Sequence, residues 1–371
     1  RHPHALEATR IVGGELLALA AHEDLGMAQL VAHALRALCQ LVAESLAVGS
    51  GLGHPNQGLA RTELQGHLDL FVREDALLIK LHGSRERGPH RDGVQAEVIY
   101  GILGVASGFS DAGDGVSDPE LVAEIFDIYN GWIADFCKKN PERFAGLACI
   151  SCHDPQVAAR QLKRAAKMGL KGAEINVANA VKPIYQKDWD VLWAAAAECH
   201  MPISFHTIGL PFRQPEDSAK EDCQWITLGL MYTLFQLSGP EFLASILLSG
   251  ACDRYPDFQF VLGECGVGWI PYVLYRIDQE YEDRLFHLNL SKKPSEFWRR
   301  QGYSTFQDER LTSEIVQAVG EDNILWGSDY PHIEGTFPKS QQILEEILAG
   351  CTEEEKAKMV GGNAERIYGV N

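Results

Sequence analysis

The chain of 371 residues has no long apolar run and no cluster of basic residues. Without a stretch of about 18 uncharged apolar residues, no membrane-spanning helix is expected. No basic start followed by an apolar run and a small-residue cleavage site is seen either, so the expected location is the cytoplasm. The 33 basic residues stand against 51 acidic ones, for a formal charge of −18. This balance argues against a nucleic-acid or anionic-membrane surface, because both need clustered Lys and Arg.

The nine cysteines are an odd number, scattered from Cys39 to Cys351. In a chain of this length they do not form the pattern of a disulfide framework, so reduced thiols are expected. Cys149, Cys152 and His153 match the C-x-x-C-H pattern of covalent haem attachment. The position of this motif, at the end of a predicted strand and before a capped helix, argues against haem.

Residues 1–87 are poor in aromatic residues. They contain no Trp, no Tyr and only Phe71, although the whole chain has 7 Trp, 11 Tyr and 15 Phe. Helical spacing is visible at Leu30, Ala34 and Leu38, and the Gly-rich residues 48–58 read as a loop. We therefore divide the chain into an atypical N-terminal segment, residues 1–87, and a main domain, residues 88–371.

From residue 88 onward, short β-rich runs alternate with capped helices. Helices are predicted to begin at Asp118-Pro119, Asp154-Pro155 and Asp188, with Gly169 ending the second, because Asp accepts the free N–H groups of a first turn. A further helix is predicted over residues 242–256. Such alternation requires parallel strands with right-handed crossovers, and six or more strands favour a closed (β/α)8 TIM barrel over an open sheet. The predicted strands cover residues 96–104, 143–151, 170–176, 203–209, 258–264 and 323–329.

Three of these strands end in a residue that binds metals or moves protons, namely His206, Glu264 and Asp329. The carboxyl ends of barrel strands form one active face, so these groups are expected to converge on one pocket. Imidazole and carboxylate together are ligands of divalent catalytic metals. Two plainer interpretations stay open: His206 as a structural histidine, and Glu264 as a hydrogen-bond acceptor behind the ligands or a member of a buried pair.

Several stretches carry a resemblance to a known family. They include YPDFQFVLGECGVGWIPYVLYRID, NILWGSDYPHIEGTFPKS and the closing GNAERIYGV. From about residue 92 to the C-terminus the chain resembles the amidohydrolase-related family that contains aminocarboxymuconate semialdehyde decarboxylase and the resorcylate-type decarboxylases. The resemblance implies a metal-dependent hydrolase type of barrel with one Zn or Mn ion, bound by His206 and Asp329. Glu264 takes a position that is usually His in the family.

The front of the chain departs from this family. Its members begin with Asp-x-His-x-His or a close variant, which supplies two metal ligands. His2 and His4 have the His-x-His spacing, but no apolar strand precedes them. His82 ends a strand-like run, residues 76–82, but it lies too close to the next strand for a normal crossover helix. A third interpretation is that residues 1–87 are a misread or replaced gene start and carry no site.

The resemblance implies a metal-dependent lyase or hydrolase that acts on a small carboxylated aromatic or unsaturated substrate, and non-oxidative decarboxylation is favoured. Asp329 would move the proton, with Glu264 near the metal. Arg213, Trp225 and His332 are the expected substrate contacts, although the aromatic residues after His206 could instead cover the barrel. The alternative is an incomplete, non-catalytic barrel without the first ligands. A homodimer stays open as the assembly.

Overall fold

The structure is a computed structural model that describes residues 92–101, 119–177, 180–206, 226, 229–230, 233–330, 332 and 335–370. The chain divides into two compact units. The larger consists of residues 95–107, 119–328 and 339–371, and the smaller of residues 1–94, 108–118 and 329–338. None of the described helices is long and apolar enough to cross a membrane.

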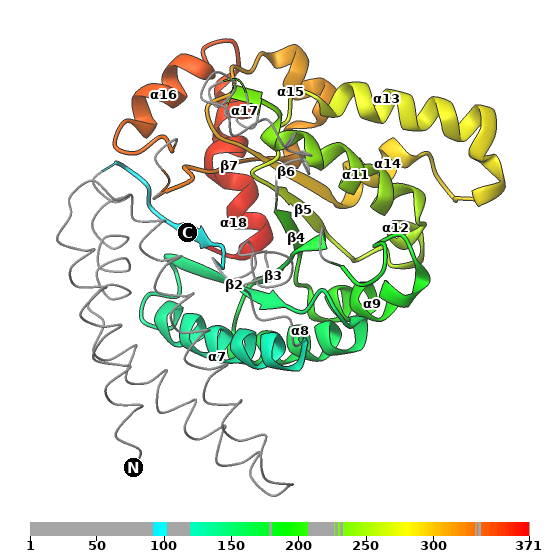
Figure 1. Cartoon of the computed structure of the whole chain (residues 1–371). Coiled ribbons are helices and arrows are strands. Elements are labelled where there is room, and N and C mark those ends of the chain that lie inside the picture. Colours follow the sequence, from blue (N-terminus) through cyan, green and yellow to red (C-terminus); the bar gives the residue numbers. More distant parts are fainter. Residues whose placement is uncertain are drawn as a thin grey trace, which may run out of the picture. The chain divides into compact units, whose positions relative to one another are not determined.

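Within the described residues, the larger unit contains a sheet of seven strands in sequence order, and every neighbouring pair is parallel (Figure 1). All six predicted strands are present. Parallel neighbours in sequence order need a crossover after each strand, as the alternating pattern indicated. The strands are β1 (Glu97–Ile99), β2 (Phe144–Ile150), β3 (Gly172–Ile175), β4 (Ile203–His206), β5 (Phe260–Gly263), β6 (Gly302–Phe306) and β7 (Ile324–Trp326).

The crossovers are helical, and Figure 1 shows α7, α8, α9 and α11 along the outer side of the sheet. The helices are α7 (Pro119–Cys137), α8 (Pro155–Met168), α9 (Asp190–Cys199), α11 (Gly239–Leu248), α12 (Ala251–Arg254), α13 (Ile270–Glu280), α14 (Pro294–Gln301), α15 (Ser313–Val319), α16 (Ser340–Ile347), α17 (Glu353–Ala357) and α18 (Asn363–Tyr368). Short turns of 3-10 or π helix are η3 (Lys187–Trp189), η4 (Phe235–Ser238), η5 (Tyr281–Leu285), η6 (Phe286–Leu288), η7 (Glu321–Asn323) and η8 (Lys358–Gly362).

Two predicted helices differ in detail from the structure. At Asp188 the chain first makes the 3-10 turn η3, and the α-helix begins only at Asp190. The helix predicted over residues 242–256 is two helices, α11 and α12, separated at Gly250, whose φ of 72° is left-handed. Glycine adopts this conformation readily, and it is incompatible with a continuous right-handed helix.

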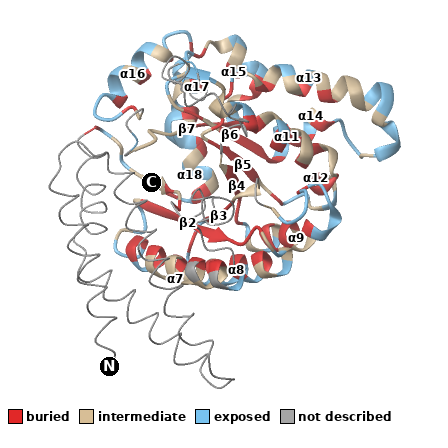
Figure 2. Cartoon of the chain, in the orientation of Figure 1, coloured by how far each residue is buried: buried red, intermediate tan, exposed pale blue. Residues whose placement is uncertain are grey.

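Most residues of the strands are buried, as the red colour in Figure 2 shows. The outward face packs against the surrounding helices, where Trp193 of α9 meets Phe205 of β4 and Phe205 in turn contacts Phe260 of β5. The other face carries a smaller cluster in which strand residues such as Leu147 and Val261 meet Tyr368 of α18. Because the strands are buried on both faces, few polar side chains belong to them, and those that do are informative.

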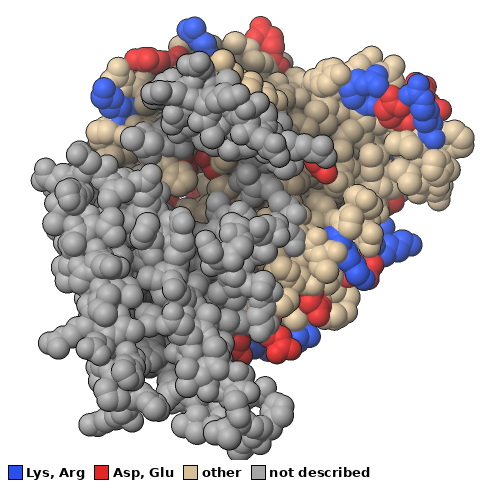
Figure 3. Space-filling view, in the orientation of Figure 1, with Lys and Arg blue, Asp and Glu red and all other residues tan. Residues whose placement is uncertain are grey.

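Charges of opposite sign alternate on the surface of the larger unit formed by α13 and the turns after it (Figure 3). Glu280 pairs with both Arg276 and Arg284, and Glu282 pairs with Lys293. Neighbouring opposite charges of this kind contribute little stability each.

Candidate functional site

The first pair of candidate residues stands at the ends of two neighbouring strands. His206 is the last residue of β4, and Glu264 directly follows β5. Their Nε2 and Oε2 atoms are 3.2 Å apart, and each side chain is 13% exposed. His206 is the register partner of Gly263, so adjacent strands bring the two side chains to one edge of the sheet. The prediction that these strand ends converge is confirmed for this pair.

A partly buried aromatic ring lies against His206. The Tyr100 ring meets the His206 ring edge-on, with 5.6 Å between their centroids. The Tyr100 hydroxyl lies 3.1 Å from Oγ of Ser204, which is fully buried two residues before His206. Burial, with Tyr368 as the next cause, raises the pKa of Tyr100 well above its ordinary value. The imidazole therefore rests on a neutral phenol, which limits the orientations open to its ring.

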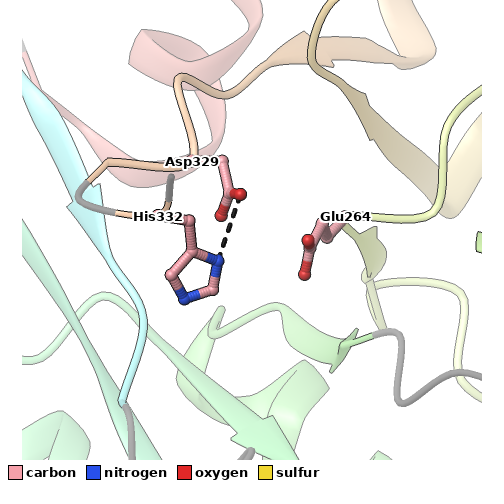
Figure 4. Close-up of side chains that lie close together, drawn as sticks. All are labelled: Glu264, Asp329 and His332. Atoms are coloured by element: carbon pink, nitrogen blue, oxygen red, sulfur yellow. Dashed lines mark hydrogen bonds and ion pairs between the residues drawn. The ribbon is translucent and has the colours of Figure 1, made fainter. Parts of the chain in front are cut away.

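The second pair lies in the smaller unit. Asp329 follows the end of β7 by three residues, and its φ of 56° is in the left-handed region. Nδ1 of His332 is 3.1 Å from Oδ2 of Asp329, and the backbone N–H of His332 donates to the Asp329 carbonyl at 2.8 Å (Figure 4). The two side chains, three residues apart in the sequence, thus fix each other's orientation. The sequence singled out both residues but not this hydrogen bond.

The residue types at these positions suit a metal ion. Asp329 and His332 each offer one ligand atom in the smaller unit, and Glu264 offers a carboxylate oxygen in the larger unit (Figure 4). Carboxylate oxygen and imidazole nitrogen are donors that Zn and Mn both accept. The donor set therefore fits the divalent metal that the sequence implied.

Several residues singled out in the sequence lie outside the described part of the chain. These are His2, His4, His82, Arg213 and Trp225. The C-x-x-C-H motif lies within it, and both of its cysteines are buried. Burial raises the pKa of Cys152 to about 11, so its thiol is neutral and unreactive at ordinary pH.

Sequence reasoning missed one buried carboxyl in β3. Glu174 is 1% exposed, and its Oε2 accepts the N–H of Gly101 at 2.9 Å. Burial raises the pKa of Glu174 to about 8. The signal was available, because Glu174 is the one charged residue among the four of a fully buried strand.

Comparison with known proteins gives one family for most of the chain. The amidohydrolase family model matches residues 79–370. The gamma-resorcylate decarboxylase of Polaromonas sp. strain JS666 is 26% identical over 273 residues, which cover 69% of this chain and 79% of that protein. The 2-amino-3-carboxymuconate-6-semialdehyde decarboxylase of Dictyostelium discoideum is 24% identical, covering 68% of each chain.

Solved structures show the same fold. The 5-carboxyvanillate decarboxylase from Sphingomonas paucimobilis matches with a TM-score of 0.63 and 25% identity, over 78% of this chain and 83% of that one. A dihydroxybenzoic acid decarboxylase from Polaromonas sp. JS666, with bound manganese and the inhibitor 2-nitroresorcinol, matches with a TM-score of 0.59 and 22% identity, over 76% and 84%. The predicted TIM-barrel class is thereby confirmed, with seven of its strands in the described residues.

Proposed function

The chain belongs to the amidohydrolase family, and from this premise we propose that it is a metal-dependent, non-oxidative decarboxylase of a small aromatic carboxylate. The observation that carries the proposal is the His206–Glu264 pair, with 3.2 Å between Nε2 and Oε2 at the ends of adjacent strands. An imidazole and a carboxylate at the active face of a barrel are what a divalent metal site in this fold requires. The names of the relatives supply the reaction.

We assign His206 and Asp329 as metal ligands, with Glu264 and His332 beside them. One Zn or Mn ion held by this set would act as a Lewis acid toward the oxygens of the substrate. His2 and His4 are proposed as further ligands, Arg213 and Trp225 as substrate contacts with His332, and a homodimer as the assembly. These last assignments rest on the sequence alone.

The chemical step proposed for the chain's own residues is the transfer of one proton. When the bond between the ring carbon and the carboxylate breaks, CO2 leaves and the electron pair stays on the ring carbon. Asp329 would pass a proton from solvent water to that carbon, where the new C–H bond forms, and would be left as a carboxylate. The hydrogen bond between Nδ1 of His332 and Oδ2 of Asp329 fixes the direction of this carboxyl group.

The proposal is tested by replacing Asp329 with Asn. Two probes are used, 2,6-dihydroxybenzoate and 5-carboxyvanillate, and CO2 release is followed with Mn or Zn present. We expect wild-type turnover of at least one acid and a loss of about 10²- to 10⁴-fold in D329N, because the amide cannot carry the proton. The control is D257N, which removes a carboxylate exposed at the surface and should retain full activity. Retained turnover in D329N, or none in the wild type, would overturn the proposal.

A further inference from the structure

The turn that follows β5, residues 264–268, has an unusual backbone. Glu264 has a φ of 54° and Gly266 a φ of 65°. A non-glycine residue in the left-handed region is uncommon, and it persists where surrounding contacts hold it. Since Glu264 is the residue of this turn whose carboxylate reaches His206, whatever fixes the turn also fixes that carboxylate.

The contacts that hold the 264–268 turn come from β6 and the loop after it. The N–H of Glu264 donates to Oγ1 of Thr305 at 2.6 Å, and Oγ of Ser304 donates to the Gly266 carbonyl at 2.8 Å. Two further N–H groups of the turn donate to one side chain. Val267 N–H reaches Oε2 of Glu309 at 2.9 Å, and Gly268 N–H reaches Oε1 at 3.2 Å.

Glu309 is suited to this task by its surroundings. Burial raises its pKa, while the two N–H donors, Gly268 first, act in the opposite direction by stabilising the carboxylate. A Cβ at Gly266 would lie 3.0 Å from both carboxylate oxygens, so the turn and the carboxylate are in close contact. Two residues later, Leu311 is buried and its N–H donates to the Ile347 carbonyl at 3.0 Å, which anchors the segment that carries Glu309.

We propose that Glu309 is a positioning residue for Glu264. Its carboxylate receives two consecutive N–H groups of the 264–268 turn and, together with the Thr305 hydroxyl, holds Glu264 in its left-handed conformation facing His206. This inference rests on the proposed function, because it assigns Glu264 to a metal site. Groups that orient metal ligands in this way typically affect metal affinity by about 10- to 100-fold.

The first measurement follows backbone hydrogen exchange in the metal-free full chain. Gly268 is exposed, so the protection of its N–H depends on Glu309. In E309A we expect exchange of a peptide covering the 264–268 turn to become about tenfold faster, because two hydrogen bonds are lost. E309Q keeps one acceptor oxygen, so its exchange rate should lie between those of the wild type and E309A. The matched control is D308N, which removes the neighbouring exposed charge and should leave this exchange unchanged.

The second measurement is the dissociation constant for Mn²⁺, or for Zn²⁺, in the same variants. E309A should weaken binding by about 10- to 100-fold and D308N should not. At Thr305, T305S keeps the hydroxyl and should bind as the wild type does, whereas T305V should bind more weakly. Thermal unfolding of each metal-free variant confirms that the compared proteins are folded, and E309Q replaces E309A if the latter is not.

Three results would decide against the positioning role or against its premise. Unchanged exchange in E309A and E309Q overturns the inference. Faster exchange with an unchanged metal dissociation constant also overturns it, because Glu309 would then support only the local fold. A wild-type chain that takes up neither Mn²⁺ nor Zn²⁺ contradicts the proposed function instead, and the exchange measurement then still decides whether Glu309 holds the turn.

Discussion

At the scale of single residues, the buried Glu174 makes the stability of the folded chain depend on pH. Its carboxyl is buried, its pKa is raised to about 8 by desolvation, and its Oε1 accepts no hydrogen bond from the residues that the structure describes. Between the ordinary value of 4.5 and about 8, the folded chain keeps this proton while the unfolded chain has lost it. The folded state then binds more protons, so stability falls as pH rises through this window.

We therefore expect E174Q to have a shallower pH dependence of unfolding than the wild type. From pH 5 to pH 8, ionisation of this group should lower the free energy of unfolding of the wild type by up to about 1.4 kcal/mol per pH unit. E174Q should not show this loss, because an amide does not ionise. Urea unfolding at several pH values measures the slope. E354Q, which changes an exposed carboxylate of α17, serves as the control and should keep the wild-type slope. Equal slopes for E174Q and the wild type would contradict the assignment.

How much of the candidate site could be predicted from the sequence also depends on single residues. His206 and Glu264 were predictable because strand ends in a parallel barrel share one edge, and the structure places them as neighbours. Thr305 and Glu309 were not predictable, since their role depends on contacts with a turn some 40 residues earlier in the chain. A hydroxyl or carboxylate on a loop has no local pattern that names its distant partner.

At the scale of elements, α8 shows how completely local chemistry can specify a helix. Asp154 Oδ1 accepts the N–H groups of Gln156 and Val157, Pro155 occupies the first turn, and Gly169 ends the helix with a φ of 92°. All of these signals lie within the helix or next to it, which is why the sequence predicted both ends. By contrast, β6 begins directly after α14 with no loop between them, and its sequence GYSTF has no alternating pattern that indicates a strand.

For this element we expect D154A to lower the free energy of unfolding by about 1 kcal/mol, because two first-turn N–H groups lose their acceptor. D154N and D154S keep an acceptor oxygen and should lose only a few tenths of that amount. Chemical unfolding compares the three variants with the wild type. A loss in D154N as large as in D154A would mean that the charge, acting on the helix dipole, matters more than the cap.

At the scale of the whole molecule, the order of the sheet followed from the alternation of strands and helices, because parallel neighbours require a crossover. What the alternation could not supply is the separation between particular side chains. The distance of 3.2 Å between His206 and Glu264 depends on the register of β4 with β5 and on the left-handed backbone at Glu264. Neither feature can be predicted from the residues of the strands themselves.

Binding of a metal to the folded chain should be visible in global stability. A ligand that binds only the folded state at about 100 times its dissociation constant stabilises it by roughly 2.7 kcal/mol. We therefore expect Mn²⁺ or Zn²⁺ to raise the melting temperature by several degrees, a chelator to reverse the shift, and Mg²⁺ to have less effect because it prefers oxygen to imidazole ligands. H206A and D329N should each abolish most of the shift, whereas D257N should preserve it, since that residue is exposed at the surface. A shift of the same size in H206A would show that the metal binds elsewhere. The assignment of the strand-end residues as metal ligands would then be wrong, even if the chain is a decarboxylase.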